Sequence, residues 1–240
     1  MENDYPTKQP GGYDFLMEEE VESKFADINV KLLNGRHIQV ITDPAEYDLL
    51  SQDSYFKGFY AFYKNLYQLD LLVRQIGLFE KYYYLFPPEA ELGALSSQKL
   101  HIPLTENQTL FGLMLLTMYY EKSFDRVKEG SWDDIRESIL HSECQEKYKL
   151  IFFGRVNEGN NYTDSEWSFV RGNFKRMVQR FDELGWLTAS NIDSSNFKFI
   201  INVSIHRLED IYSKELANPE VLFDKLMTRK LNKDDDGLIS

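Results

Sequence analysis

The stretch from residue 163 to residue 203 constrains the fold more than any other part of this chain, because a long amphipathic helix leads directly into two apolar segments. The helix is expected to begin at Thr163 or Asp164, where Glu166 suits the positive end of the helix dipole, and to end near Gly185. At about 100° per residue, its large apolar side chains fall within one arc of roughly 100°, the width of a core-facing stripe. These side chains are Trp167, Val170, Phe174, Met177, Phe181 and Leu184.

The two apolar segments that follow, residues 186–189 and 197–201, are typical of short strands. Between them, Asp193, Ser194, Ser195 and Asn196 have side chains that close turns through local hydrogen bonds. A helix that runs into such a hairpin is the core of a winged helix, a module that docks on nucleic acid or protein.

The first half of the chain has the same order of elements. Asn34-Gly35 is a typical helix end, and Thr42-Asp43-Pro44 is a typical helix start. The expected elements are a helix at 15–33, a strand at 36–41, helices at 44–52 and 53–67, and strands at 69–76 and 81–86. We therefore predict an α+β fold, mainly α-helical, built from tandem winged-helix modules.

The second half repeats this plan with an insertion. Thr105 and Gln108 form a capping box before a helix that is apolar on nearly all sides, which predicts a central position. A helix follows at 132–141, the stretch 143–163 is interpreted as irregular, and a terminal helix is expected at 204–216. The predicted organisation is a flexible N-terminal segment at 1–14, a first module at 15–90, a linker at 91–104, a second module at 105–205, and a terminal helix and acidic tail at 206–240.

The charge balance limits contact with DNA to a local patch. The 240 residues include 27 basic and 39 acidic side chains, a formal net charge of −12, so the whole surface should not coat nucleic acid. One local patch is predicted on the outer face of helix 163–185 and on the adjoining hairpin, where few amide side chains are available to read bases. Its residues are Arg171, Lys175, Arg176, Arg180 and Lys198. The alternative is an ordinary solvated helix face.

No residue pattern indicates an enzyme, a cofactor or a metal site. His141 and Cys144 form only half of a metal site, and no phosphate-binding Gly-rich loop is present. A single cysteine excludes an internal disulfide, and no apolar run approaches the roughly 18 residues that indicate a membrane span. Because the start also lacks the features of a signal peptide, we expect a cytoplasmic protein without membrane contact.

The helix expected at 53–67 carries more aromatic side chains than one core-facing stripe can hold. Some of them are therefore expected to face an oligomer or partner surface. The candidates for this interface are Tyr55, Phe59 and Tyr63.

Several strings occur together in the order and spacing of a known family. They are Leu32-Leu33-Asn34-Gly35-Arg36-His37-Ile38, the aromatic helix at 55–67, Tyr83-Tyr84-Leu85-Phe86-Pro87-Pro88, Leu184-Gly185-Trp186 and Asp193-Ser194-Ser195-Asn196-Phe197-Lys198. In these strings the chain resembles the MukE/MksE family, accessory subunits of bacterial condensin-like complexes, over about residues 15–205. The acidic N-terminal extension, the segment 148–153 and the terminal helix match this family poorly.

The resemblance implies a non-catalytic homodimer that binds a kleisin of the MukF/MksF kind and, through it, an SMC ATPase of the MukB/MksB kind. Such a subunit associates with the nucleoid and contributes to a DNA clamp without sequence specificity, in chromosome organisation and segregation. Three alternatives stay open from the sequence: an accessory subunit of an SMC-type anti-plasmid defence complex, a winged-helix transcription regulator, and a structural adaptor that does not touch DNA.

Overall fold

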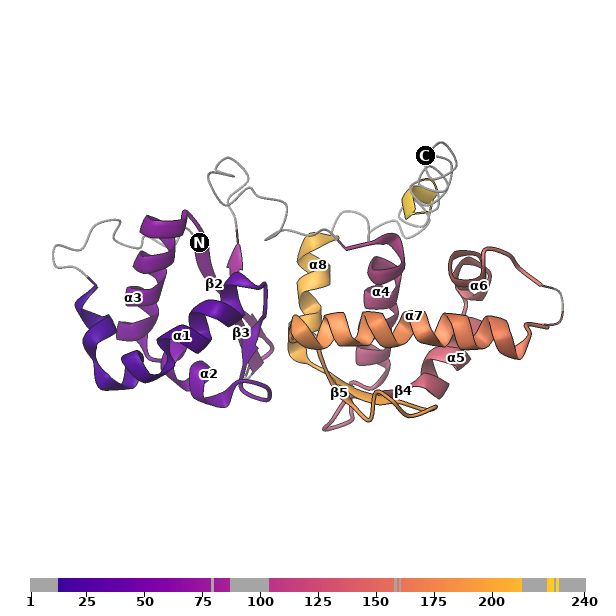
Figure 1. Ribbon diagram of the computed structural model, residues 1–240, viewed down its shortest axis with the longest axis horizontal. Helices are drawn as coiled ribbons and strands as arrows, with labels where there is room; N and C mark the ends of the chain where they lie inside the picture. Colours follow the sequence, from indigo (N-terminus) through magenta and orange to yellow (C-terminus); the bar gives the residue numbers. More distant parts are fainter. Residues whose placement is uncertain are drawn as a thin grey trace. The chain divides into compact units, whose positions relative to one another are not determined.

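The computed structural model divides the chain into two compact units, Met1–Ile102 and Pro103–Ser240 (Figure 1). It describes residues 13–78, 80–86, 104–157, 159, 161–212, 224–226 and 228. Each unit combines helices with a three-stranded antiparallel sheet, so the fold is α+β and mainly helical, as the sequence predicts. Most of the expected N-terminal segment, linker and acidic tail lies outside the described residues.

The first unit follows the predicted order of helix, strand, helix, helix, strand, strand. Its elements are α1 (Glu19–Leu33), β1 (Ile38–Gln39), α2 (Pro44–Leu50), α3 (Asp53–Phe62), β2 (Asp70–Ile76) and β3 (Glu80–Phe86). A 3-10 turn, Asp14–Met17, precedes α1, and α3 continues as a π-helical turn, Tyr63–Tyr67. The sheet order is β1-β3-β2. The helix expected from residue 15 therefore starts later, because Glu18 has an extended backbone with ψ of 130° that interrupts it.

Local sequence sets the ends of these elements. Gly35 has a φ of 82°, the left-handed conformation that ends α1, and Pro44 occupies the first turn of α2, where its missing amide has no helical partner. Gly77 has a φ of 61° in the turn between β2 and β3. Gly35 and Pro44 confirm the predicted helix end and helix start. The predicted strand at 36–41 is shorter, since only Ile38 and Gln39 pair with β3.

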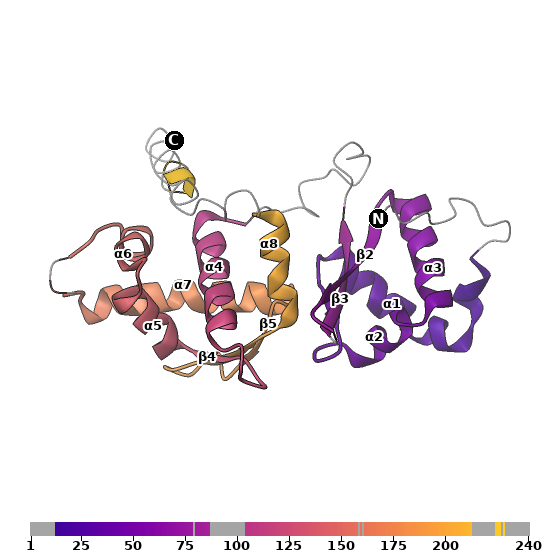
Figure 2. The ribbon, with the colours of Figure 1, turned by 180° about the vertical axis from the view of Figure 1, so that it is seen from behind.

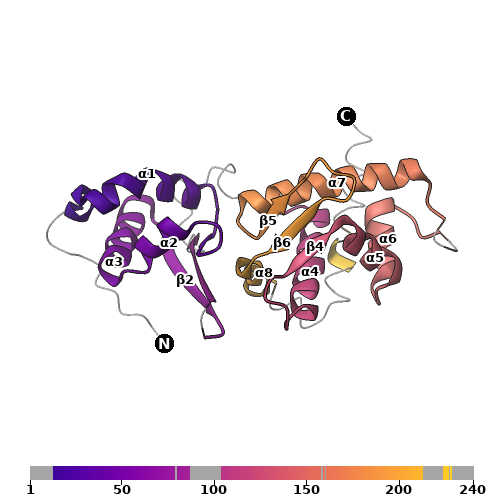
Figure 3. The same ribbon diagram turned by 90° about the horizontal axis from the view of Figure 1, so that it is seen from below.

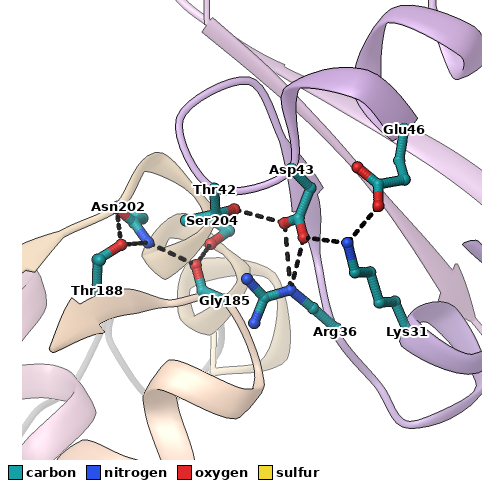
Figure 4. A network of polar contacts seen from close by, with 9 residues as sticks. All are labelled: Lys31, Arg36, Thr42, Asp43, Glu46, Gly185, Thr188, Asn202 and Ser204. Atoms are coloured by element: carbon teal, nitrogen blue, oxygen red, sulfur yellow. Dashed lines mark hydrogen bonds and ion pairs between the residues drawn. The ribbon is translucent and has the colours of Figure 1, made fainter. Parts of the chain in front are cut away.

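A buried charge network joins the end of α1 to the start of α2 (Figure 4). The Asp43 side chain is only 1% exposed and accepts hydrogen bonds from Arg36 Nε at 3.0 and 3.2 Å. Lys31 Nζ lies 3.0 Å from the same carboxylate and also pairs with Glu46. Burial lowers the pKa of Lys31, but the hydrogen bonds to Glu46 and Asp43 outweigh it and raise the pKa above 10.5. Two cations thus compensate the buried Asp43 carboxylate.

The second unit repeats the order with one helix inserted and another added at the end. Its elements are α4 (Glu106–Glu121), β4 (Glu129–Ser131), α5 (Trp132–His141), α6 (Gln145–Phe153), α7 (Asp164–Glu183), β5 (Leu187–Ser190), β6 (Lys198–Ile201), a 3-10 turn (Val203–His206) and α8 (Arg207–Ile211). The sheet order is β4-β6-β5, with Gly130 opposite Phe199.

Three elements of this unit differ from the prediction. The stretch 143–163 is not irregular throughout, because α6 buries Tyr148, Ile151 and Phe152 at helical spacing and ends at Gly154 with a φ of 74°. Strand β4 is absent from the prediction, since three residues that include a glycine carry no strand pattern. The predicted terminal helix is shorter and follows a 3-10 turn, and its residues 213–216 lie outside the described part.

Helix α4 forms the centre of the second core. Its predicted capping box is present, with Thr105 Oγ1 accepting from the Gln108 amide and Gln108 Oε1 accepting from the Thr105 amide. Leu110, Phe111 and Leu115 are fully buried in a core that also includes Leu226. Helix α7 crosses in front of α4 and α5 in Figure 1 and lies behind them in Figure 2, so it forms one outer side of this unit. In Figure 3, β5 and β6 extend from one end of α7.

Candidate nucleic-acid interface

Helix α7 is fixed at its start by a capping box. The Glu166 amide donates to Thr163 Oγ1 at 3.3 Å, and Glu166 Oε2 accepts from the Thr163 amide at 2.8 Å. The hydrogen bonds from the Thr163 amide and hydroxyl, together with Arg155, hold the pKa of Glu166 below its ordinary value of 4.5. The predicted apolar stripe is confirmed, because Val170, Phe174 and Phe181 are at most 1% exposed.

A buried polar cluster connects the end of α7 to the hairpin (Figure 4). Asn202 Nδ2 donates to the Gly185 carbonyl at 3.0 Å and to Thr188 Oγ1 at 3.1 Å. Ser204 Oγ donates to the same Gly185 carbonyl at 2.7 Å. Because Gly185 has a φ of 76° and follows Leu184, the C-cap residue of α7, this cluster orients the hairpin on the helix.

The turn between β5 and β6 is also attached to α5 and α7. Asn196 Nδ2 donates to the Asp133 carboxylate at 2.7 Å, and the Asp133 amide donates to Asn196 Oδ1 at 3.2 Å. From α7, Arg171 Nη1 approaches the Ser195 carbonyl at 3.5 Å. The hairpin and the outer side of α7 therefore form one continuous surface.

The predicted cations of α7 divide into two groups on this surface. At about 100° per residue, Arg171 and Lys175 lie about 40° apart, and so do Arg176 and Arg180. The second pair starts about 140° around the helix from Arg171. The helix therefore presents two separate cationic edges instead of one continuous face.

The two edges differ in how their cations are bound within the chain. Arg180 Nη1 pairs with Glu183 at 2.9 Å, and Arg176 Nη2 donates to Asn173 Oδ1 at 2.6 Å. Among the residues that the structure describes, Arg171, Lys175 and Lys198 form no ion pair with a carboxylate. The surface best suited to a polyanion is therefore the edge formed by Arg171, Lys175 and Lys198, which we call the cationic edge.

Arg136 of α5 belongs beside this edge but is missing from the sequence prediction. It lies with Arg171 around a pocket between α5 and α7. The i, i+4 spacing of Trp132 and Arg136 indicates that they share a helix face. The sequence gives no signal that this face meets α7, because α5 and α7 are separated by α6.

The aromatic candidates in the first unit occupy different positions. Phe59 and Tyr63 are 0% exposed, so their prediction as surface residues is wrong. Phe15 packs against Phe59 with ring centroids 5.3 Å apart. The turn that precedes α1 therefore buries an aromatic side chain of α3 that the sequence predicts at the surface. Burial raises the pKa of Tyr63 well above its ordinary value. Tyr55 is partly buried and donates a hydrogen bond to Glu18 at 2.8 Å.

The described ranges contain no group of three His, Cys, Asp or Glu side chains that could hold a metal ion. His141 instead lies 4.0 Å from Glu137 on the same helix, and Cys144 packs against the second core. Within the same ranges, every helix is too short or too polar to cross a membrane.

Comparison with known proteins identifies the class and then the family. The model of a family described as condensin complex protein MksE matches residues 23–212, which places the chain among condensin complex proteins. The chain belongs to the MksE family, whose members are accessory subunits of condensin-like complexes. No curated protein matches the sequence. The family match confirms the resemblance found in the sequence.

Proposed function

We propose that this chain is the non-catalytic accessory subunit of a bacterial MksBEF-like condensin, in which it binds the kleisin and contributes to a DNA clamp. The observation that carries this proposal is the family match over residues 23–212, which extends across both units. In such a complex, an SMC ATPase supplies the energy of ATP hydrolysis, and this subunit supplies binding surfaces. The expected setting is the nucleoid, in chromosome organisation and segregation.

We further propose that both units are winged-helix modules. Their strand orders, β1-β3-β2 and β4-β6-β5, are equivalent, with the last strand of each unit in the middle. In both units a helix directly precedes the terminal hairpin, as it does when a recognition helix precedes a wing. Helix α7 would then be the recognition helix of the second module, and the β5–β6 hairpin its wing.

The DNA contact is assigned to the cationic edge, with Arg176 and Arg180 as weaker candidates. Phosphate contacts need accessible cations but carry no sequence information, which suits a clamp. A cation that already pairs within the chain releases fewer DNA counterions, because it must first give up its partner. Arg171, Lys175 and Lys198 should therefore dominate the salt dependence of binding.

Two double variants of equal charge test this assignment on the assembled complex. Arg171→Gln with Lys175→Gln should lower the slope of log affinity against log salt by about two, since each lost phosphate contact removes roughly one counterion. Arg176→Gln with Arg180→Gln should lower it by less than one. Arg176 is exposed and the other three side chains are partly exposed, and none belongs to the apolar stripe of α7, so both variants should leave folding nearly intact.

Equal slopes for the wild type and the first variant would mean that the cationic edge is a solvated helix face. A site-specific DNase footprint by the chain alone would instead support a transcription regulator.

A further inference from the structure

We propose that a pocket between α5 and α7 holds one phosphate group of the DNA backbone between Arg136 and Arg171. This inference rests on the proposed DNA contact and adds to it a defined site and a residue outside α7. The pocket has a volume of about 270 Å³, too small for most organic ligands but sufficient for a phosphate with water. It is lined by Trp132, Arg136, Asp164, Trp167, Ser168 and Arg171.

Arg136 is held in place before any ligand arrives. Its guanidinium carbon lies 4.9 Å from the ring centroid of Trp167, the distance of a cation–π contact. Trp167 is fixed in turn by edge contacts with Trp132 at 6.0 Å and Phe153 at 4.9 Å. A stacked guanidinium loses less conformational freedom on binding than a solvated one. Because Phe153 ends α6, the inserted helix supports this site.

Arg171 supplies a second guanidinium from the α7 side. Within the described ranges, neither Arg136 nor Arg171 forms an ion pair with a carboxylate. Guanidinium groups match the oxygen geometry of phosphate and bind it through paired hydrogen bonds. The exposed Ser168 hydroxyl is a further donor in the pocket lining. These donors give the pocket the chemistry of an anion site.

Asp164 is the one carboxylate in the lining, and its charge opposes a bound phosphate. It should therefore keep the affinity moderate, which suits a clamp that must release DNA. The lining therefore allows two variants with opposite expected effects. Neutralising Asp164 should raise the affinity for DNA, and neutralising Arg136 should lower it.

The surroundings favour DNA over an acidic protein segment. Lys175 lies one helical turn beyond Arg171, and Lys198 lies on the adjoining hairpin. A single acidic side chain would need only the pocket, whereas consecutive phosphates of a strand need cations spread over a surface. The pocket would fix one phosphate and the cationic edge would follow the backbone from it.

The test measures DNA affinity against salt for the complex of this chain with its kleisin and SMC ATPase. Arg136→Gln should lower the slope by about one, Arg136→Lys should keep the slope, and Asp164→Asn should raise the affinity at every salt concentration. The matched control is Arg126→Gln, an exposed arginine in the loop between α4 and β4, which should change nothing. Unfolding midpoints followed by tryptophan fluorescence verify that each variant folds.

Lys175→Gln with Lys198→Gln, outside the pocket, separates this inference from the proposed function. An effect of that pair without an effect of Arg136→Gln would overturn the pocket alone, and no effect of either would overturn both. Loss of kleisin binding in Arg136→Gln with an unchanged DNA slope would mean that the pocket binds an acidic protein segment. Saturable quenching of the full chain's tryptophan fluorescence by micromolar inorganic phosphate would identify a free phosphate ligand and would also overturn the proposal.

Discussion

At the residue scale, the stability of the first unit depends strongly on the buried Asp43 carboxylate. We predict that Asp43→Asn lowers the free energy of unfolding by about 2 to 3 kcal/mol, because it leaves Arg36 and Lys31 beside each other without the charge between them. Asp48→Asn on the exposed side of α2 is the matched control and should stay within about 0.5 kcal/mol. Urea denaturation followed by circular dichroism measures both. Equal effects would show that the network contributes no more than a surface charge.

Glu166 gives the start of α7 a defined pH dependence. The pKa of Glu166 is below 4.5 in the folded chain, so its contribution to stability is fully present above pH 4.5 and is lost as the pH falls through the folded pKa. Glu166→Gln keeps a capping-box side chain but removes the charge. Thermal unfolding from pH 7 to pH 3 should show wild type more stable than the variant at pH 7 and the difference shrinking below pH 4.5. A difference that is constant with pH would contradict this role.

At the element scale, two helical glycines should respond to alanine with opposite signs. A Cβ at Gly112 of α4 would lie 2.5 Å from the buried Leu208, so Gly112→Ala should destabilise the second unit by about 1 to 3 kcal/mol. A Cβ at Gly172 of α7 meets open space, so Gly172→Ala should stabilise by about 0.5 to 1 kcal/mol. All three tryptophans lie in this unit, and their fluorescence reports its unfolding. Stabilisation by both changes would mean that Leu208 moves aside freely.

Elements with strong local signals could be predicted from the sequence. The capping box at Thr105 and the helix end at Gly35 depend on a few neighbouring residues, and both are present. Strand β4 could not be predicted, because Gly130 belongs to the sheet only through its pairing with Phe199, far along the chain. The burial of Phe59 depends likewise on Phe15 from another element.

The candidate site shows the same limit. Helical periodicity predicts the cations of α7. The pairing of Arg180 with Glu183 depends instead on side-chain rotamers, and the contact of Arg136 with Trp167 depends on the packing of α5 against α7. Local periodicity predicts which side of a helix is polar. Only the assembled core determines which of those polar groups share a surface.

At the scale of the whole molecule, we predict that the chain forms a homodimer through the first unit. Of the predicted interface residues, Tyr55 is the one that retains exposed surface. Light scattering at micromolar concentration should give a mass of about twice 28.3 kDa. A mass of one chain at these concentrations would contradict the dimer but not the family.

The central claim is that this chain works as a subunit of a condensin-like complex. The most direct measurement is affinity purification of the tagged chain from its native host, expressed from its own locus, with mass spectrometry of the proteins recovered. We predict that an SMC-type ATPase and a kleisin are recovered in near-stoichiometric amounts, and that the ATPase activity of the sample follows the SMC subunit. Recovery of the chain with neither protein would contradict the account.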